Sequence, residues 1–338
     1  MANAIQQTAK GLVYGLATLP PGETVKQAVH DGDTVRVSLD GSFSVRFLGI
    51  DTPEVSFTLP GTDNFLPIGN QRWQQFLTDP FAPQYGPFSR LEPDGVTKIE
   101  GSAETILGGE LLHDLRARLG PECATNHAAH AEAAHRRLEK LIQDDVNERQ
   151  QQGRPYRFFL AFSHTVVDRY GRLLAFVHRD ETRQERQGRS SYNERLLADG
   201  LASPYFIWPN IDPFRVQASR RAAVPRPDQL AAWLTTGDGQ KLETVRQAVG
   251  EARQAGKGIY GTVGTHSKLA LLPFELRYLA GRRAPDRYVL DLSTAGTVRA
   301  NILFDPRTYH RIPNPEDRLF IDADDVLLFL NRGYVVES

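Results

Sequence analysis

The sequence predicts an α+β protein in which short strands and amphipathic helices share one chain. Residues 35–39 and 43–47 alternate apolar and polar side chains, which is typical of strands with one buried face. Residues 156–167 are aromatic and β-branched and predict a further strand, with 173–177 as its partner. Residues 131–150 carry an apolar stripe with helical spacing, which predicts a helix that braces the strands.

Composition limits the class of protein. A chain of 338 residues exceeds the usual size of one compact domain, and its net charge of −1 provides no general basic field for nucleic acid. The single cysteine, Cys123, excludes an intramolecular disulfide framework. The apolar run at 11–19 is too short for a membrane span and poor as a signal peptide, so we expect a cytoplasmic protein without a membrane partner.

The two alternating runs predict a β-hairpin with its turn at Asp40-Gly41. A two-residue loop would pair Val37 with Ser44 and place an apolar side chain beside a polar one. A three-residue loop pairs Val37 with Val45 instead, so we expect the longer loop.

Carboxylates meet at the open end of this predicted hairpin. The register places Asp33 opposite Gly49 and Asp31 opposite Asp51. Carboxylates this close repel unless a cation intervenes, and oxygen ligands suit calcium or magnesium. The sequence therefore predicts a divalent cation site, although each short motif alone is also typical of a turn or a helix cap.

Arg46 has the wrong strand parity for this site. In the predicted register Arg36 and Arg46 face each other, on the side opposite to Asp33. A bend near Gly49 would swing Arg46 toward the cation.

Three motifs together resemble the staphylococcal nuclease, or thermonuclease, family. They are Asp-Gly-Asp-Thr at 31–34, Arg46 placed five residues before Asp-Thr-Pro-Glu at 51–54, and Asp-Arg-Tyr-Gly-Arg at 168–172. Further matches are Tyr-Asn-Glu at 192–194 and Gly-Ile-Tyr-Gly at 258–261. The resemblance covers about residues 26–56 and 129–261.

The resemblance implies an OB-fold-like five-stranded barrel with three helices that hydrolyses DNA and RNA with little sequence specificity and leaves 3′-phosphate ends. It implies Ca²⁺, with Mg²⁺ or Mn²⁺ possible, held by Asp33, Asp51 and the carbonyl of Thr52. It implies Glu54, Arg46 and Arg172 as catalytic residues, the first acting on water and the arginines on phosphate. It implies substrate contacts from Arg169, Tyr170 and an aromatic among Tyr205, Phe206 and Trp208.

The chemistry of phosphodiester hydrolysis needs these residue types. Attack by water spreads negative charge over the phosphate oxygens, so a cation and guanidinium groups stabilise the transition state. Arginine offers two parallel donors where lysine offers a point charge. The competing hypothesis is a non-catalytic nuclease-like module that binds nucleic acid or protein; such modules lack the acidic and arginine residues that this sequence has.

We expect an N-terminal segment at 1–25, a nuclease-like domain at 26–261 with an insertion at about 55–128, and a small C-terminal α+β domain at 262–338. The C-terminal domain resembles nothing familiar and would bind a protein partner or assist substrate positioning. Aromatic residues of the insertion can form a lid, with Arg72 and Trp73 contacting substrate. A satellite core is the interpretation that we favour for them.

Smaller patterns predict local structure. Ser191 and Glu194 form a capping box, and Gly200 is placed to end that helix. His127, His130 and His135 lie near Cys123 but give no complete zinc spacing, so we expect solvated or capping histidines.

Overall fold

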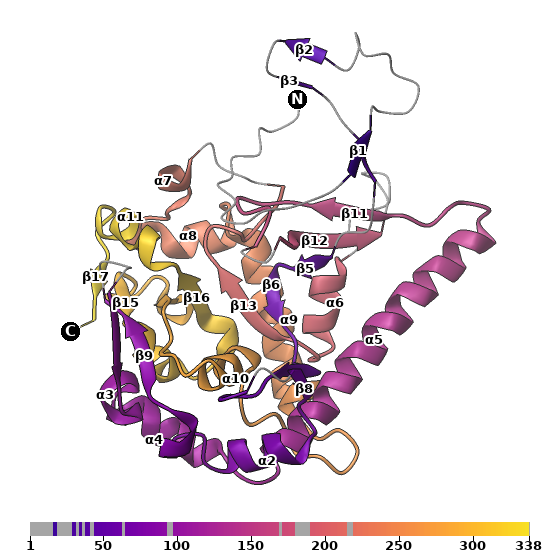
Figure 1. The fold of residues 1–338 in the computed structure, drawn as a ribbon. Coiled ribbons are helices and arrows are strands. Elements are labelled where there is room, and N and C mark those ends of the chain that lie inside the picture. The colour runs from indigo at the N-terminus through magenta and orange to yellow at the C-terminus, as the bar shows by residue number, and fades with distance from the viewer. Residues whose placement is uncertain are drawn as a thin grey trace.

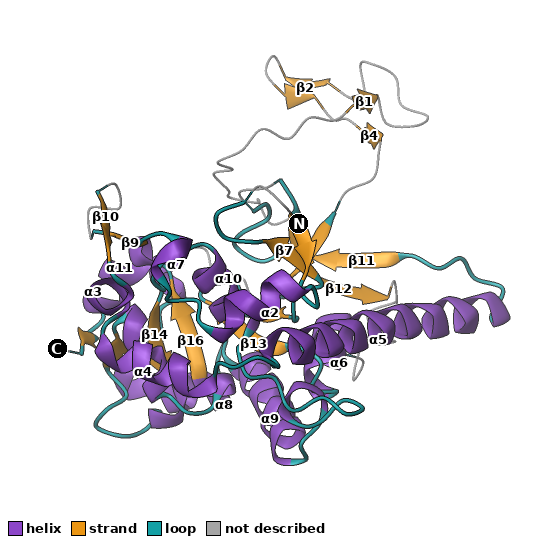
Figure 2. Cartoon of the chain, turned by 60° about the horizontal axis from the view of Figure 1, so that its bottom comes forward, coloured by secondary structure: helices purple, strands orange, loops and turns teal. Residues whose placement is uncertain are grey.

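The computed structural model describes residues 44–62, 65–92, 97–168, 171–179, 190–214 and 219–337, together with the backbone of four short strands within residues 16–40. The α+β class is confirmed, because several sheets and many helices share the chain (Figures 1 and 2). The described residues form no closed barrel.

The elements alternate irregularly along the chain. The strands are β1 (Leu16–Thr18), β2 (Val29–Asp31), β3 (Thr34–Val35), β4 (Ser38–Asp40), β5 (Val45–Phe47), β6 (Gly49–Asp51), β7 (Ser56–Thr58), β8 (Phe65–Pro67), β9 (Phe88–Leu91), β10 (Lys98–Gly101), β11 (Phe158–Ala161), β12 (Leu173–Arg179), β13 (Ser203–Ile207), β14 (Tyr288–Asp291), β15 (Ile302–Phe304), β16 (Arg318–Ile321) and β17 (Val335–Val336). The helices are α2 (Gln71–Thr78), α3 (Ala103–Leu107), α4 (Gly109–Arg118), α5 (Cys123–Gln151), α6 (Tyr192–Ala198), α7 (Arg220–Ala223), α8 (Leu230–Thr235), α9 (Gln240–Gln254), α10 (Pro273–Ala280) and α11 (Val326–Leu330). Short 3-10 helices are η1 (Pro83–Tyr85), η2 (Pro227–Gln229), η3 (Gly258–Tyr260), η4 (Leu292–Thr294), η5 (Pro306–Arg311), η6 (Pro315–Asp317) and η7 (Ala323–Asp325).

The largest sheet joins the nuclease-like part to the C-terminal region. Its six strands run in the order β17-β15-β14-β16-β13-β6, and β13 pairs in parallel with β16 through Phe206 and Leu319. Figure 1 shows these late strands beside β13 and β6. The expected boundary after Gly261 therefore falls within a continuous sheet.

A second sheet has the order β11-β12-β5. Strands β11 and β12 are antiparallel, whereas β12 and β5 are parallel with Leu174 opposite Arg46. The predicted turn at 168–172 is confirmed, since the Asp168 N–H donates to the Arg172 carbonyl and Gly171 has a φ of 79°. Residues 169 and 170 lie outside the described part of the chain.

The predicted hairpin register is wrong. Val35 pairs with Val29, and Asp31 pairs with Thr34, so the Asp-Gly-Asp-Thr segment closes a short local hairpin. Asp51 pairs with Ser203 of β13 instead of with Asp31. Turn-forming residues favour the local pairing, because closing a short loop costs less entropy than closing a long one. Val37 and Asp33 lie outside the described residues.

A first hydrophobic cluster joins the insertion to the C-terminal region. Trp73, Phe76 and Phe88 of the insertion are completely buried and pack in one cluster with Phe274 and Phe320. Figure 2 shows α3 and α4 on the same side of the molecule as β14 and β16. The satellite-core interpretation is confirmed. Trp73 as a substrate contact is wrong, because its ring is buried.

A second hydrophobic cluster fills the nuclease-like part. It gathers β6, β12, α6 and α9, and it also contains Leu290, Leu303 and Leu319 from the C-terminal strands. Both clusters thus contain residues from both sides of the expected boundary, so the C-terminal strands contribute to the core of the nuclease-like part.

The sequence correctly predicted where α6 begins and ends. The capping box of Ser191 and Glu194 begins α6, and Gly200 follows its end with a φ of 68°. Helix α5 begins at Cys123, earlier than expected, and Gly108 separates α3 from α4. Helix α10 was not predicted. In the described part of the chain no helix combines the length and apolar character that crossing a membrane requires.

Candidate functional site

A backbone bend at Gly49 brings Arg46 to the acidic site. The strand breaks between β5 and β6, and Gly49 has a φ of 73°, a left-handed conformation that glycine adopts without strain. Across the bend, Arg46 Nη2 on β5 lies 2.9 Å from Asp51 Oδ1 on β6. The predicted bend near Gly49 is confirmed, although the hairpin register from which it was predicted is wrong.

Asn193 holds this bend from behind. Its side chain is buried; the amide nitrogen donates to the Leu48 carbonyl at 2.8 Å, and its oxygen accepts from the Val177 N–H at 2.9 Å. Helix α6 therefore fixes the turn before Gly49 against β12. A buried amide with both groups satisfied holds one geometry.

An arginine from the C-terminal region joins the two expected acidic residues. Arg277 on α10 donates from both terminal nitrogens to the two carboxylate oxygens of Asp51, at 2.8 and 2.7 Å. Its Nη1 also lies 2.7 Å from Glu54 Oε1. The Asp51 side chain is 1% exposed and the Glu54 side chain 23%. Arg277 thus links Asp51 and Glu54, and Arg46 adds a second positive charge on Asp51.

Burial and neighbouring charges shift the pKa values of Glu54 and Arg277. Burial raises the pKa of Glu54 above its ordinary value; Arg277 opposes the rise, and the negative charge of Asp51 adds to it. Burial alone would lower the pKa of Arg277, but its contacts with Asp51 and Glu54 raise it above its ordinary value. Arg277 is therefore a permanent cation.

His127 fixes the backbone of Glu54. Its Nε2 accepts the Glu54 N–H at 2.8 Å, and burial lowers the pKa of His127 to about 3, with His130 and Arg277 adding to the effect. The ring is neutral at physiological pH and can act as this acceptor. His130 Nε2 lies 2.9 Å from the Ser267 carbonyl. The expectation of solvated or capping residues is wrong for these two buried histidines, whereas exposed His135 agrees with it.

Arg172 lies on the neighbouring strand. It precedes β12, whose Leu174 is opposite Arg46, so the two arginine α-carbons are about 8 Å apart by standard strand spacing. The Arg172 side chain pairs with Asp168 at 2.7 Å and is 37% exposed. The structure thus brings Arg46, Asp51 and Glu54 together and places Arg172 beside them, with its guanidinium on Asp168. Arg169, Tyr170 and Asp33 lie outside the described residues.

The expected stacking aromatics are core residues, which corrects that expectation. Tyr205 stacks on Phe274, Phe206 packs in the second cluster, and Trp208 is completely buried. Their alternation along β13 and the residues after it places them between the sheet and its covering helices. They offer no exposed ring face to a nucleobase.

The oxygen atoms of Asp51, Thr52 and Glu54 are ligands of the type that hard cations such as Ca²⁺ prefer. Asp51 and Glu54 direct oxygens to a common point, and Thr52 lies between them in the chain. Within the described ranges, no group of three or more His, Cys, Asp or Glu side chains is arranged to hold a metal ion. The expected ligand Asp33 is outside those ranges.

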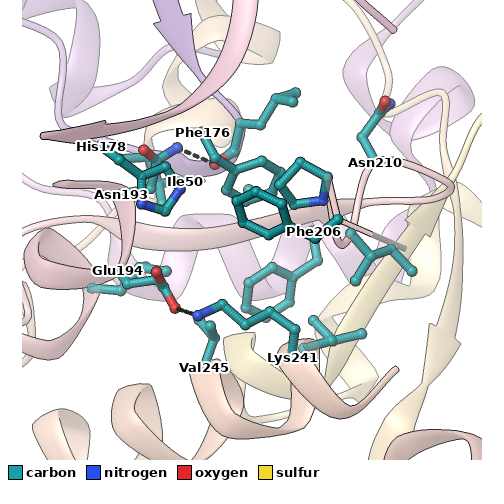
Figure 3. Close-up of a pocket in the computed structure, with 16 residues that line it drawn as sticks. Ile50, Phe176, His178, Asn193, Glu194, Phe206, Asn210, Lys241 and Val245 are labelled. Atoms are coloured by element: carbon teal, nitrogen blue, oxygen red, sulfur yellow. Dashed lines mark hydrogen bonds and ion pairs between the residues drawn. The ribbon is translucent and has the colours of Figure 1, made fainter. Parts of the chain in front are cut away.

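A pocket beside this site has different chemistry. It encloses about 470 Å³, including space open to solvent, between Phe176, Phe206 and α9, and Figure 3 shows Glu194 paired with Lys241 on its wall. The described residues that line it include no arginine and are mostly apolar. We therefore place the chemistry at Asp51 and Glu54.

Two residues of the site were missed from the sequence. Arg277 lies 226 residues after Asp51, and no local pattern connects them. Helix α10 itself had a signal, namely Pro273 at the first helical position and Gly281 after the end. For His127 the sequence predicts a solvated or capping residue, and it gives no signal for a buried acceptor of the Glu54 N–H.

Comparisons with known proteins add no further assignment. No family model matches this sequence, and searches of curated proteins and of solved structures also found no match. The resemblance to thermonucleases therefore rests on the motifs and on the geometry described above.

Proposed function

We propose that this protein is a metal-dependent nuclease that hydrolyses phosphodiester bonds of DNA and RNA with little sequence specificity. The convergence of Arg46, Asp51 and Glu54 at the Gly49 bend is the observation that carries the proposal. The motif resemblance requires the side chains of these three residues to lie close together, whereas an ordinary turn or helix cap does not. We also propose that β5, β11 and β12 belong to an OB-type barrel.

The residues divide the chemistry between them. Asp51, the Thr52 carbonyl and Asp33 would hold Ca²⁺, with Mg²⁺ or Mn²⁺ as alternatives. When bound, such an ion neutralises charge on the phosphate and makes a water molecule more acidic. Arg46 and Arg172 bind the non-bridging phosphate oxygens, for which Arg172 exchanges its contact with Asp168 for the substrate.

Glu54 acts on the attacking water. Its carboxylate accepts a proton as the water oxygen bonds to phosphorus, and the bond from phosphorus to the 5′ oxygen breaks. The leaving 5′ oxygen takes up a proton from solvent water, Glu54 returns its proton to solvent, and the phosphate stays on the 3′ side. The contact with His127 fixes the Glu54 backbone for this role.

A non-catalytic binding module is the second candidate, and Arg277 is the observation that favours it. Its guanidinium pairs with both carboxylates in this structure, and together with Arg46 it balances their two negative charges. A module that had replaced its metal by an internal cation would bind nucleic acid or protein without cutting it.

One experiment separates the two candidates. The full-length protein is incubated with circular single-stranded DNA, circular double-stranded DNA and RNA, with Ca²⁺ or with EDTA. A nuclease cuts the circles with Ca²⁺ and stops with EDTA. A binding module shifts their mobility and leaves them intact with either addition, which would refute the proposal.

Replacing Glu54 by glutamine tests the catalytic assignment. The variant keeps the side-chain shape but cannot accept the proton, so kcat should fall by about 10²- to 10⁴-fold. Glu139→Gln is the control, because Glu139 is exposed on α5 and contacts His135. Equal rates for Glu54→Gln and wild type would remove Glu54 from the mechanism.

A further inference from the structure

Arg277 occupies the position that a cation would need. Its guanidinium contacts both oxygens of Asp51 and one oxygen of Glu54. Arg46 also donates to Asp51 Oδ1. A divalent ion that approaches the Asp51 oxygens would therefore meet the positive charge of Arg277 and compete with it for their lone pairs.

The helix that carries Arg277 is firmly held. Glu275, two residues earlier, is buried and accepts two hydrogen bonds from Arg118 and one from Tyr309. Glu275 also accepts a hydrogen bond from the Leu272 N–H at the start of α10. The helix therefore stays in place, and Arg277 can leave the acidic site by rotation of its own side chain, which is 20% exposed.

The carboxylates of Asp51 and Glu54 require Arg277 or another positive charge in its place. Asp51 is almost fully buried, and a buried carboxylate without a positive partner is strongly unfavourable. Arg46 donates to one oxygen of Asp51, and Arg277 supplies the second positive charge that balances Asp51 and Glu54 together when no metal is bound. A divalent ion would supply that charge otherwise.

We propose that Arg277 is an internal counter-ion that competes with the divalent cation for Asp51 and Glu54 and so sets the metal affinity of the site. This inference rests on the proposed metal site. In the metal-free protein Arg277 holds the two carboxylates together, and metal binding displaces its guanidinium. The C-terminal region thereby controls when the nuclease-like site is loaded.

Calcium binding by the full-length protein tests the competition directly. Titration calorimetry on metal-free protein compares wild type, Arg277→Gln and the control Arg253→Gln, whose arginine pairs with Glu316. If the open arrangement is a minor state of wild type, Arg277→Gln should bind Ca²⁺ about tenfold to a thousandfold more tightly. Arg253→Gln should bind like wild type.

Unchanged or weaker Ca²⁺ binding by folded Arg277→Gln would overturn the inference. Unchanged binding with a lower kcat would instead make Arg277 a third phosphate-binding arginine. Tighter binding without nucleic-acid cleavage by either protein would support the inference and refute the proposed nuclease. Nucleic-acid cleavage by wild type, together with no gain in Ca²⁺ affinity in Arg277→Gln, would support the proposed nuclease and overturn the inference.

A measurement on wild type covers the case in which Arg277→Gln does not fold. Crystals of the full-length protein are soaked in Ca²⁺. An ion on Asp51 with the Arg277 guanidinium moved away would support the competition. An ion on Asp51 with all Arg277 contacts retained would overturn it.

Discussion

At the scale of single residues, short motifs identified side chains that the fold brings together. The spacing of Arg46, Asp51 and Glu54 was visible in the sequence, and the need for a bend at Gly49 followed from strand parity. Arg277 was not predictable, because its contact depends on how α10 packs in three dimensions. A buried ion pair between distant residues has no local signature.

His127 should make the protein less stable in mild acid. Its pKa is about 3 in the folded protein and near 6.5 when exposed. As the pH falls below 6.5, the unfolded chain binds a proton that the folded protein excludes, so stability is lost until about pH 3. At pH 5 this costs roughly 2 kcal/mol, at about 1.4 kcal/mol for each pKa unit.

The variant His127→Gln tests this effect, because glutamine also accepts a hydrogen bond but does not titrate. Urea denaturation in EDTA at pH 7.5 and pH 5 should show that the variant loses roughly 2 kcal/mol less than wild type. His135→Gln, at an exposed position, should behave like wild type. Identical losses in His127→Gln and wild type would show that the ring is protonated in the folded state.

At the scale of elements, prediction succeeded where the signal was local. A capping box and a glycine stop predicted α6, and an apolar stripe predicted most of α5. The predicted pairing of residues 156–167 with 173–177 is confirmed by β11 and β12, whereas the hairpin pairing failed, because Asp51 pairs with Ser203, which lies far along the chain. Alternation shows which face of a strand is buried but does not identify its neighbour.

Arg118 should stabilise the contact between α4 and α10. It donates twice to Glu275, whose side chain is 2% exposed, at 2.8 and 2.9 Å. Arg118→Met would leave this carboxylate without its cation, and we expect a loss of about 3–5 kcal/mol in the free energy of unfolding. Chemical denaturation of the full-length variant measures it.

Two further variants show whether the buried charge is the cause. Arg136→Met removes an exposed pair with Glu132 and should leave the denaturation midpoint close to that of wild type. The double variant Arg118→Met, Glu275→Gln removes both charges and should be more stable than Arg118→Met alone. If the double variant is the less stable of the two, the unpaired charge is not the reason.

At the scale of the whole molecule, the sequence suggested a separable C-terminal domain, and the structure has a continuous sheet. The change of pattern after Gly261 is real in sequence, since the family resemblance ends there. The sheet continues across this point, because β16 lies between β13 and β14. A motif resemblance can end inside a sheet, whereas a domain boundary depends on where contacts are few.

A chain that ends at Gly261 should therefore fail to fold cooperatively. It would expose the edge of β13 and the faces of Trp73 and Phe76, whose partners include Phe274 and Phe320. A chain that ends at Tyr334 is the control, since it loses only the exposed edge strand β17 and the residues after it. Thermal unfolding followed by near-ultraviolet circular dichroism should show a sharp transition for the control and none for the shorter chain. A sharp transition in the shorter chain would mean that the nuclease-like part folds alone, and the acidic site would then be open to cations without Arg277.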